Sequence, residues 1–74
     1  MTPTNSLNGY KLLLVSAVGS RDGMAVELAR ESGEQVAEVF EEDTSKNRTV
    51  TFFTDQPVPL NVVKWLLSEA EREL

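Results

Sequence analysis

Residues 24 to 41 have the sequence MAVELARESGEQVAEVFE, and this stretch decides the fold. Its first part, residues 24–30, alternates apolar residues with small or charged ones, which is the two-residue period of a β-strand. Residues 31–34 (ESGE) are typical of a tight turn, in which Gly33 can take a positive φ. Residues 35–41 (QVAEVFE) predict the next strand, so the whole stretch predicts a β-hairpin.

Two further segments with strand character flank this hairpin. Residues 10–18 (YKLLLVSAV) are a short run that is apolar on both faces, and the turn cluster at 19–23 (GSRDG) could close a hairpin after it. A polar loop at 42–48 leads to residues 49–54 (TVTFFT), whose β-branched and aromatic side chains favour a strand. Because the later strands follow one another through short loops, we expect an antiparallel meander.

The sequence pattern changes after Asp55. Pro57 and Pro59 exclude a central strand and favour a helix entry, with Asn61 as an alternative N-cap. A helix over about 59–73 is expected, and its apolar stripe is predicted to contain Leu60, Val63, Leu66, Leu67, Ala70 and Leu74. The predicted fold class is α+β, a β-meander of three to four strands with one C-terminal helix packed on one face.

The length and composition allow one small domain. Of the 74 residues, 1–9 are expected to form a flexible tail and 10–74 a single domain. The net charge of −5 argues against binding nucleic acid or an anionic membrane surface. No stretch approaches the length of a membrane span, and the apolar run after Lys11 is shorter than a secretion signal needs, so a cytoplasmic location is expected.

The sequence offers little catalytic chemistry. It contains no histidine and no cysteine, so the familiar pairs of nucleophile and base are absent. Gly19 and Gly23 are not followed by the lysine and hydroxyl residue of a phosphate-binding loop. We therefore predict no catalytic residue, no cofactor and no metal ligand, and we expect the chain not to be an enzyme.

A single helix can cover only one face of the predicted sheet. That face is expected to carry Met24, Val26 and Leu28 with Ala37 and Val39, and the opposite face Val36, Phe40 and Phe53. The first strand adds Tyr10, Leu12 and Leu14 to one face and Leu13, Val15 and Ala17 to the other. Such an apolar second face favours a partner or a second copy, with coverage by the tail or by a curled sheet as the alternative.

The register of the central hairpin has two solutions. A two-residue loop at Ser32 and Gly33 would place Glu27 opposite Glu38, two like charges. A three-residue loop with a bulge would pair Arg30 with Glu34 but would set Glu38 opposite Val26. The choice decides which face each apolar residue occupies.

The helix carries one candidate binding site. Helical geometry places Trp65 on the outward side, near Val62 and Arg72. Tryptophan and arginine are enriched at binding hot spots, so these three residues predict an anchor for a partner protein. The alternative is that the indole folds over Val58 and Pro59 or along the flank of the helix.

The acidic residues Glu38, Glu41, Glu42 and Asp43 form the second candidate site. They lack the spacing and the glycine of a calcium loop. They could dock a basic partner, and the alternative is a solvated loop that protects a sheet edge.

These features together predict a non-catalytic interaction protein, such as an accessory subunit, an inhibitor or an immunity-type protein. Its partner is expected to be another protein or a second copy of itself in a homodimer. The alternative is an enzyme or a protein that binds a small ligand at a homodimer seam, with Tyr10, Glu27, Glu38 and Thr51 as its polar residues.

Overall fold

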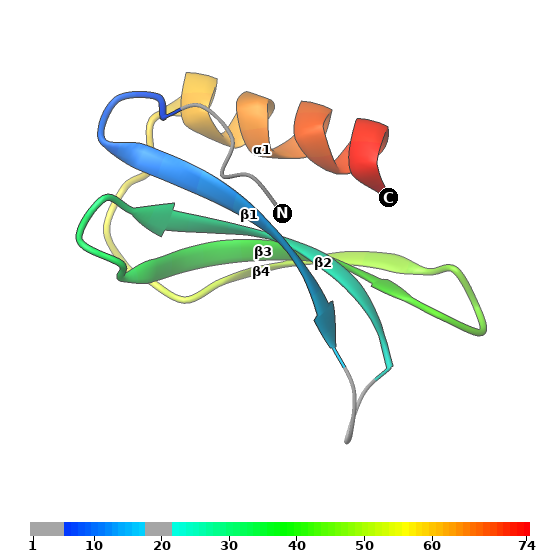
Figure 1. Ribbon diagram of the computed structural model, residues 1–74. Coiled ribbons are helices and arrows are strands. Elements are labelled where there is room, and N and C mark those ends of the chain that lie inside the picture. The colour runs from blue at the N-terminus through cyan, green and yellow to red at the C-terminus, as the bar shows by residue number, and fades with distance from the viewer. Residues whose placement is uncertain (1–5, 18–21) are drawn as a thin grey trace.

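The computed structural model describes residues 6–17 and 22–74, which form one antiparallel sheet and one helix (Figure 1). The elements are β1 (Tyr10–Ala17), β2 (Gly23–Arg30), β3 (Gln35–Glu42), β4 (Arg48–Phe52) and α1 (Leu60–Glu73). The strands lie in the order β1-β2-β3-β4, each antiparallel to the next. The predicted α+β meander is confirmed.

Parts of two expected features lie outside the described residues: residues 1–5 of the tail, and residues 18–21 at the end of the first predicted strand and in the turn after it. The described part of the tail forms a tight turn onto β1. Leu7 and Tyr10 exchange backbone N–H to O=C bonds, both of 2.9 Å, and Leu7 packs against the core.

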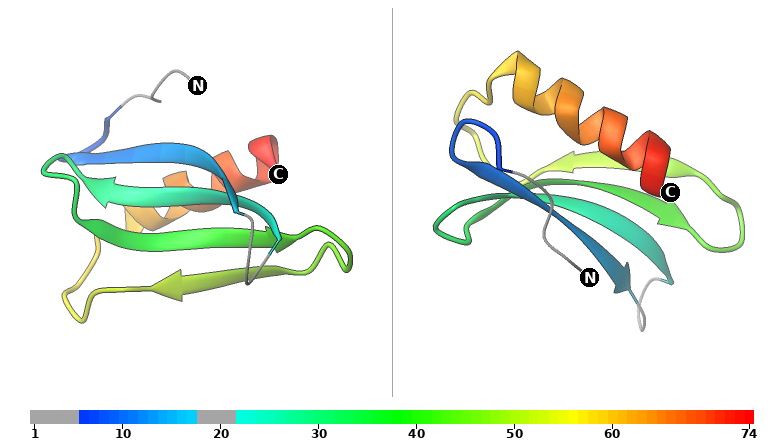
Figure 2. Two further views of the ribbon diagram at one scale, coloured as in Figure 1. Left: turned by 60° about the horizontal axis from the view of Figure 1, so that its bottom comes forward. Right: turned by 45° about the horizontal axis from the view of Figure 1, so that its top comes forward.

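The helix lies across one face of the sheet (Figures 1 and 2). Neither a helix nor a strand of the described chain covers the other face, which we call the open face. As expected, the covered face carries Val26, Leu28, Ala37 and Val39, which are all buried. The helix contributes its own buried residues to this core: Val62, Leu66 and Ala70. The removal of these apolar side chains from water is the main stabilising term for a domain of this size.

The predicted helical stripe is rotated in the structure. Val62, Leu66 and Ala70 face the sheet, whereas Leu60 and Leu67 are exposed. At 100° per residue this core line is centred about 60° from the expected one. The apolar residues of α1 span a broad arc, and the helix periodicity alone does not determine which part of that arc packs on the sheet.

The hairpin combines features of both expected registers, because β3 contains a bulge at Val36. Gly33, with φ of +102°, closes a three-residue loop, and the Arg30 N–H donates to the Glu34 carbonyl at 2.8 Å. The register then shifts by one residue at Val36, so that Glu27 still lies opposite Glu38. The expected placement of Val36 on the open face is therefore wrong, because the bulge turns it into the core, where it is fully buried.

Candidate interaction surface

The outer edge of β4 presents backbone hydrogen-bonding groups that no strand of the described chain pairs. On the inner side, the N–H of Glu42 donates to the Asn47 carbonyl at 3.0 Å, and the N–H of Phe53 to the Val36 carbonyl at 2.7 Å. Because hydrogen-bonded pairs alternate along an antiparallel ladder, Thr49 and Thr51 also direct their amides toward β3. The amides and carbonyls of Arg48, Val50 and Phe52 therefore point outward.

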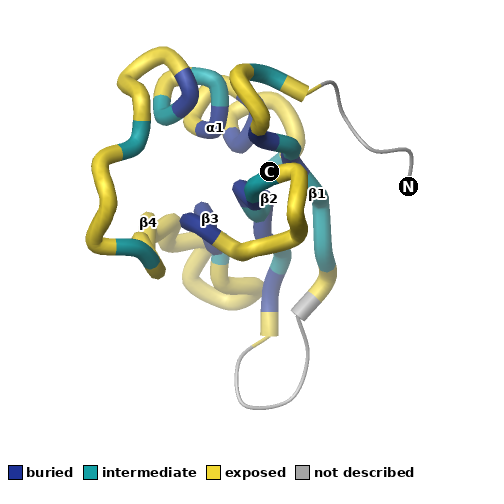
Figure 3. Tube along the Cα trace, turned by 90° about the vertical axis from the view of Figure 1, so that its left-hand side faces the viewer, coloured by how far each residue is buried: buried dark blue, intermediate teal, exposed yellow. Residues whose placement is uncertain are grey.

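The helix-side face of β4 is not covered by α1. Val50 pairs with Val39 and Phe52 pairs with Ala37, so both side chains lie on the same face as the core. The helix packs on β1, β2 and β3 but does not reach β4 (Figure 3). Val50 is consequently 45% exposed and Phe52 48% exposed.

The flank of α1 that turns toward β4 is also apolar. The helix is right-handed and runs in the same direction as β1 (Figure 1), so the position after each core residue lies on the β4 side. Leu67, which follows Leu66, is 45% exposed, and Leu60 at the helix start is 68% exposed. We call Val50, Phe52, Leu60 and Leu67 the apolar strip.

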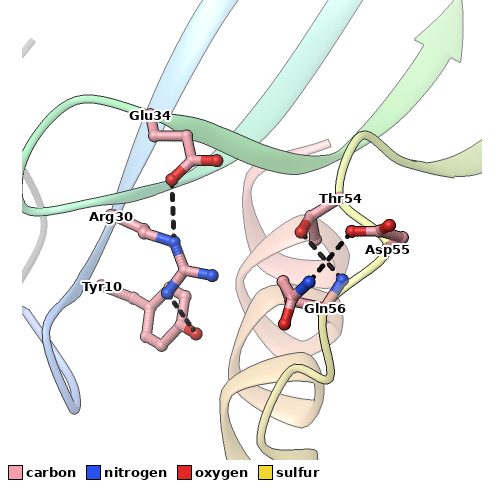
Figure 4. A network of polar contacts seen from close by, with 6 residues as sticks. All are labelled: Tyr10, Arg30, Glu34, Thr54, Asp55 and Gln56. Atoms are coloured by element: carbon pink, nitrogen blue, oxygen red, sulfur yellow. Dashed lines mark hydrogen bonds and ion pairs between the residues drawn. The ribbon is translucent and has the colours of Figure 1, made fainter.

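A compact turn ends the strand beyond Phe52 (Figure 4). The backbone N–H of Gln56 donates to Thr54 Oγ1 at 3.0 Å, and its side-chain amide donates to Asp55 Oδ1 at 3.2 Å. The chain then crosses to α1, which begins after Pro59 without a side-chain cap. Asp55 therefore lies just past the end of β4, and its carboxylate is the first charge after the strand.

The predicted helix anchor is altered by the rotation of α1. Val62 is fully buried, so its expected outward placement is wrong. Trp65 is half-buried and packs against the core. Arg72 is exposed and bonds the largely buried carboxylate of Glu69, and this hydrogen bond, with the attraction between the two charges, raises the pKa of Arg72. Trp65 and Arg72 remain on the surface, but without Val62.

The four acidic residues of the second candidate site do not form one surface. Glu38 is 2% exposed and lies on the open face, whereas Glu41 points to the opposite face. Glu41 pairs with Arg48 at 2.9 Å, and Glu42 accepts a hydrogen bond from Ser45. Only Glu42 and Asp43 are exposed together, at the start of the loop between β3 and β4.

The polar residues expected at a ligand site are divided between the two faces. Glu27, Glu38 and Thr51 lie in one row across the open face, because Glu27 is opposite Glu38 and Glu38 opposite Thr51. Tyr10 lies on the helix side, paired with Arg30. The structure therefore does not bring these four residues together.

Tyr10 belongs instead to a network at one end of the sheet (Figure 4). The Arg30 guanidinium lies 5.3 Å from the centre of the Tyr10 ring and donates to its hydroxyl at 3.1 Å. The same guanidinium donates to Glu34 Oε1 at 3.0 Å. This network fixes the start of β1 to the hairpin between β2 and β3, and we assign it a structural role.

Within residues 6–17 and 22–74, no cluster of three or more acidic side chains could hold a metal ion. In the same part of the chain, α1 is too short and too polar to cross a membrane. Every buried side-chain nitrogen or oxygen of the described residues has a hydrogen-bond partner.

Comparisons with protein families, with curated proteins and with solved structures found no match to this chain.

The outer edge of β4 is not among the candidate sites that the sequence predicts. The segment at 49–54 was recognised as a strand, but its position at the end of the meander also makes it an edge. The polar loop before it and Pro57 after it were the available signals, because prolines are kept out of central strands.

Proposed function

We propose that this chain is a non-catalytic interaction module that binds an extended polypeptide segment along the outer edge of β4. One observation carries the proposal: Val50 and Phe52 direct their backbone groups outward from the edge of β4, and their half-exposed apolar side chains lie beside that edge on the part of the helix-side face that α1 leaves uncovered. In such strand addition, backbone bonds supply affinity and alternate side chains supply specificity.

The composition of β4 supports a binding role. Proteins usually protect an exposed edge strand with lysine, proline, inward-pointing charge or a bulge. From Thr49 to Phe52 this strand contains none of these. Arg48 is its one charged residue, and the ion pair with Glu41 holds that charge against β3. The edge is therefore open to a second strand.

The apolar strip supports the same conclusion. Val50 and Phe52 lie on the same face of the sheet as the helix, whose flank toward β4 includes Leu67, and these exposed side chains would lose water contact beneath a bound segment. Neighbouring exposed apolar side chains such as Val50 and Phe52 are typical of an interaction site on a small domain. The proposal does not depend on the acidic residues or on the Trp65 flank.

A catalytic role has less support. The chain has no histidine or cysteine, and Tyr10 lies on the face opposite to Glu27, Glu38 and Thr51. A ligand site built from these four residues would need groups from both faces of one sheet.

A photocross-linking experiment tests the proposal. Phe52 is replaced by p-benzoylphenylalanine in the full chain, and the protein is irradiated in the cells that produce it. The control carries the same group at Ser68, which is exposed on the helix away from β4. An adduct to any polypeptide from position 52, and none from position 68, is expected. The absence of an adduct at 52, or equal adducts at both positions, would contradict the proposal.

A further inference from the structure

The geometry of β4 points to the identity of the bound segment: we infer that it is β4 of a second copy, antiparallel, with the two-fold axis at Val50. This inference rests on the proposed function, because it names the partner of the same edge. The result would be a dimer with one continuous sheet across the seam.

The outward backbone groups of two antiparallel β4 strands match each other. Arg48, Val50 and Phe52 present outward amides and carbonyls at alternate positions. A two-fold axis at Val50 places each Arg48 opposite Phe52 of the second copy, and Val50 opposite its own equivalent. All of these are then hydrogen-bonded pairs of an antiparallel ladder. Moving the axis along the strand by one or two residues would leave an end of β4 without a strand partner.

The charges near the two ends of β4 favour antiparallel pairing. Lys46 and Arg48 lie at the start of β4, and Asp55 lies just past its end. Antiparallel pairing brings Lys46 of each copy toward Asp55 of the other, whereas parallel pairing would bring each of these residues next to its own equivalent. Residues 49–52 are uncharged and Arg48 is neutralised by Glu41 of its own chain, so two copies with a net charge of −5 each place no unpaired charge at the centre of the seam.

The side chains of the two β4 strands also suit each other on both faces of the sheet. On the helix side, Val50 faces Val50 of the second copy, and the aliphatic part of Arg48 lies across from the Phe52 ring while its guanidinium remains paired with Glu41. On the open face, Thr49 lies opposite Thr51, two β-branched residues suited to a sheet. The two-fold axis also brings the apolar strips of both copies together on one side of the seam.

Sedimentation equilibrium of the full chain tests the inference, with Val50→Pro as the disruptive variant. The Val50 amide points away from β3, so proline removes an outward donor and leaves the β3 ladder intact. Val50→Thr keeps both the amide and the β-branched shape and serves as the matched control. We expect a dimer mass for the wild type and for Val50→Thr, and a monomer mass for Val50→Pro with an unchanged far-ultraviolet circular dichroism spectrum.

A disulfide test fixes the register and does not depend on whether the proline variant folds. The chain has no native cysteine, so Thr49→Cys and Thr51→Cys can each be made alone. In the inferred dimer, position 49 faces position 51 in a pair without hydrogen bonds, where the Cα atoms lie about 4.5 Å apart, within disulfide range. Like positions lie about 8 Å apart, beyond that range. An equimolar mixture should therefore cross-link on oxidation, while each variant alone should not.

The outcomes separate this inference from the proposed function. A wild type that stays monomeric at the highest soluble concentration overturns the second copy as the occupant. If position 52 then cross-links to a different polypeptide, the strand-binding function is retained with another partner. A dimer that survives Val50→Pro, or that cross-links through either single variant alone, places the interface elsewhere and overturns the inference.

Discussion

Val39 and Val50 lie directly opposite each other on neighbouring strands and on the same face of the sheet, yet Val39 is 4% exposed and Val50 is 45% exposed. The difference arises because the helix covers β3 and stops short of β4. One row of the sheet therefore contains both a core residue and a surface residue of the same type. The limit of helix coverage between β3 and β4 separates the core residues that stabilise the fold from the residues that we expect to bind a partner.

Replacing a valine by alanine should lower the free energy of unfolding more in the core than on the uncovered β4. Val36→Ala removes two methyl groups from a fully buried site and should lower the free energy of unfolding by about 2 kcal/mol. Val50→Ala should lower it by about 0.5 kcal/mol or less in the monomer. Urea unfolding at low protein concentration measures both. Equal losses would contradict the assignment of Val36 to the core.

Gly23 should not tolerate a side chain. A Cβ atom there would lie 2.1 Å from the Glu41 carbonyl oxygen and 2.8 Å from Cζ of the Phe40 ring. Gly23→Ala must therefore shift the backbone of β3, and we expect a loss of roughly 1–3 kcal/mol in the free energy of unfolding. Ser32→Ala in the exposed hairpin loop serves as the control, with little expected change. Thermal unfolding followed by circular dichroism distinguishes the two.

Trp65 should contribute to stability, because its half-buried indole packs against the core. Trp65→Ala should lower the free energy of unfolding by about 2 kcal/mol, less than the cost for a fully buried tryptophan. Leu67→Ala, in the apolar strip on the same helix, should cost less than about 1 kcal/mol. A Trp65→Ala variant as stable as the wild type would instead support the expectation of an indole free to bind a partner.

The network around Arg30 should have a measurable but small effect. Arg30→Ala removes both the contact with the Tyr10 ring and the ion pair with Glu34, and about 1 kcal/mol of unfolding free energy should be lost. Glu34→Gln should cost about 0.5 kcal/mol or less, because its side chain is largely exposed. If Glu34→Gln costs as much as Arg30→Ala, the ion pair rather than the ring contact is the main contribution.

Local sequence rules predicted the elements of this fold because each segment has its own period and its own turn residues. The alternation at 24–30, the turn at Gly33 and the prolines before the helix each indicate one local structure, and all of them agree with the meander. The local rules were less successful in predicting which face of the helix packs on the sheet. The residues from Val62 to Leu67 are mostly apolar, so the choice between the Val62 line and the Leu60 line depended on packing against the sheet.

The candidate site was harder to predict for the same reason. Whether Val50 and Phe52 belong to the core or to the surface depends on how far the helix extends across the sheet, which no local pattern specifies. The bulge at Val36 is likewise a compromise between the Arg30–Glu34 turn and the buried row of Leu28 and Ala37, two preferences that local rules treat separately.

Hydrogen exchange at the backbone amides of β4, followed by nuclear magnetic resonance at low and high protein concentration, shows directly whether β4 pairs with β4 of a second copy. The amide of Thr51 points to β3 and should be protected at both concentrations, whereas those of Val50 and Phe52 point outward. If β4 pairs with β4 of a second copy, Val50 and Phe52 should exchange rapidly in dilute samples and become protected as the concentration rises. Rapid exchange of both amides at every concentration would contradict pairing between two copies.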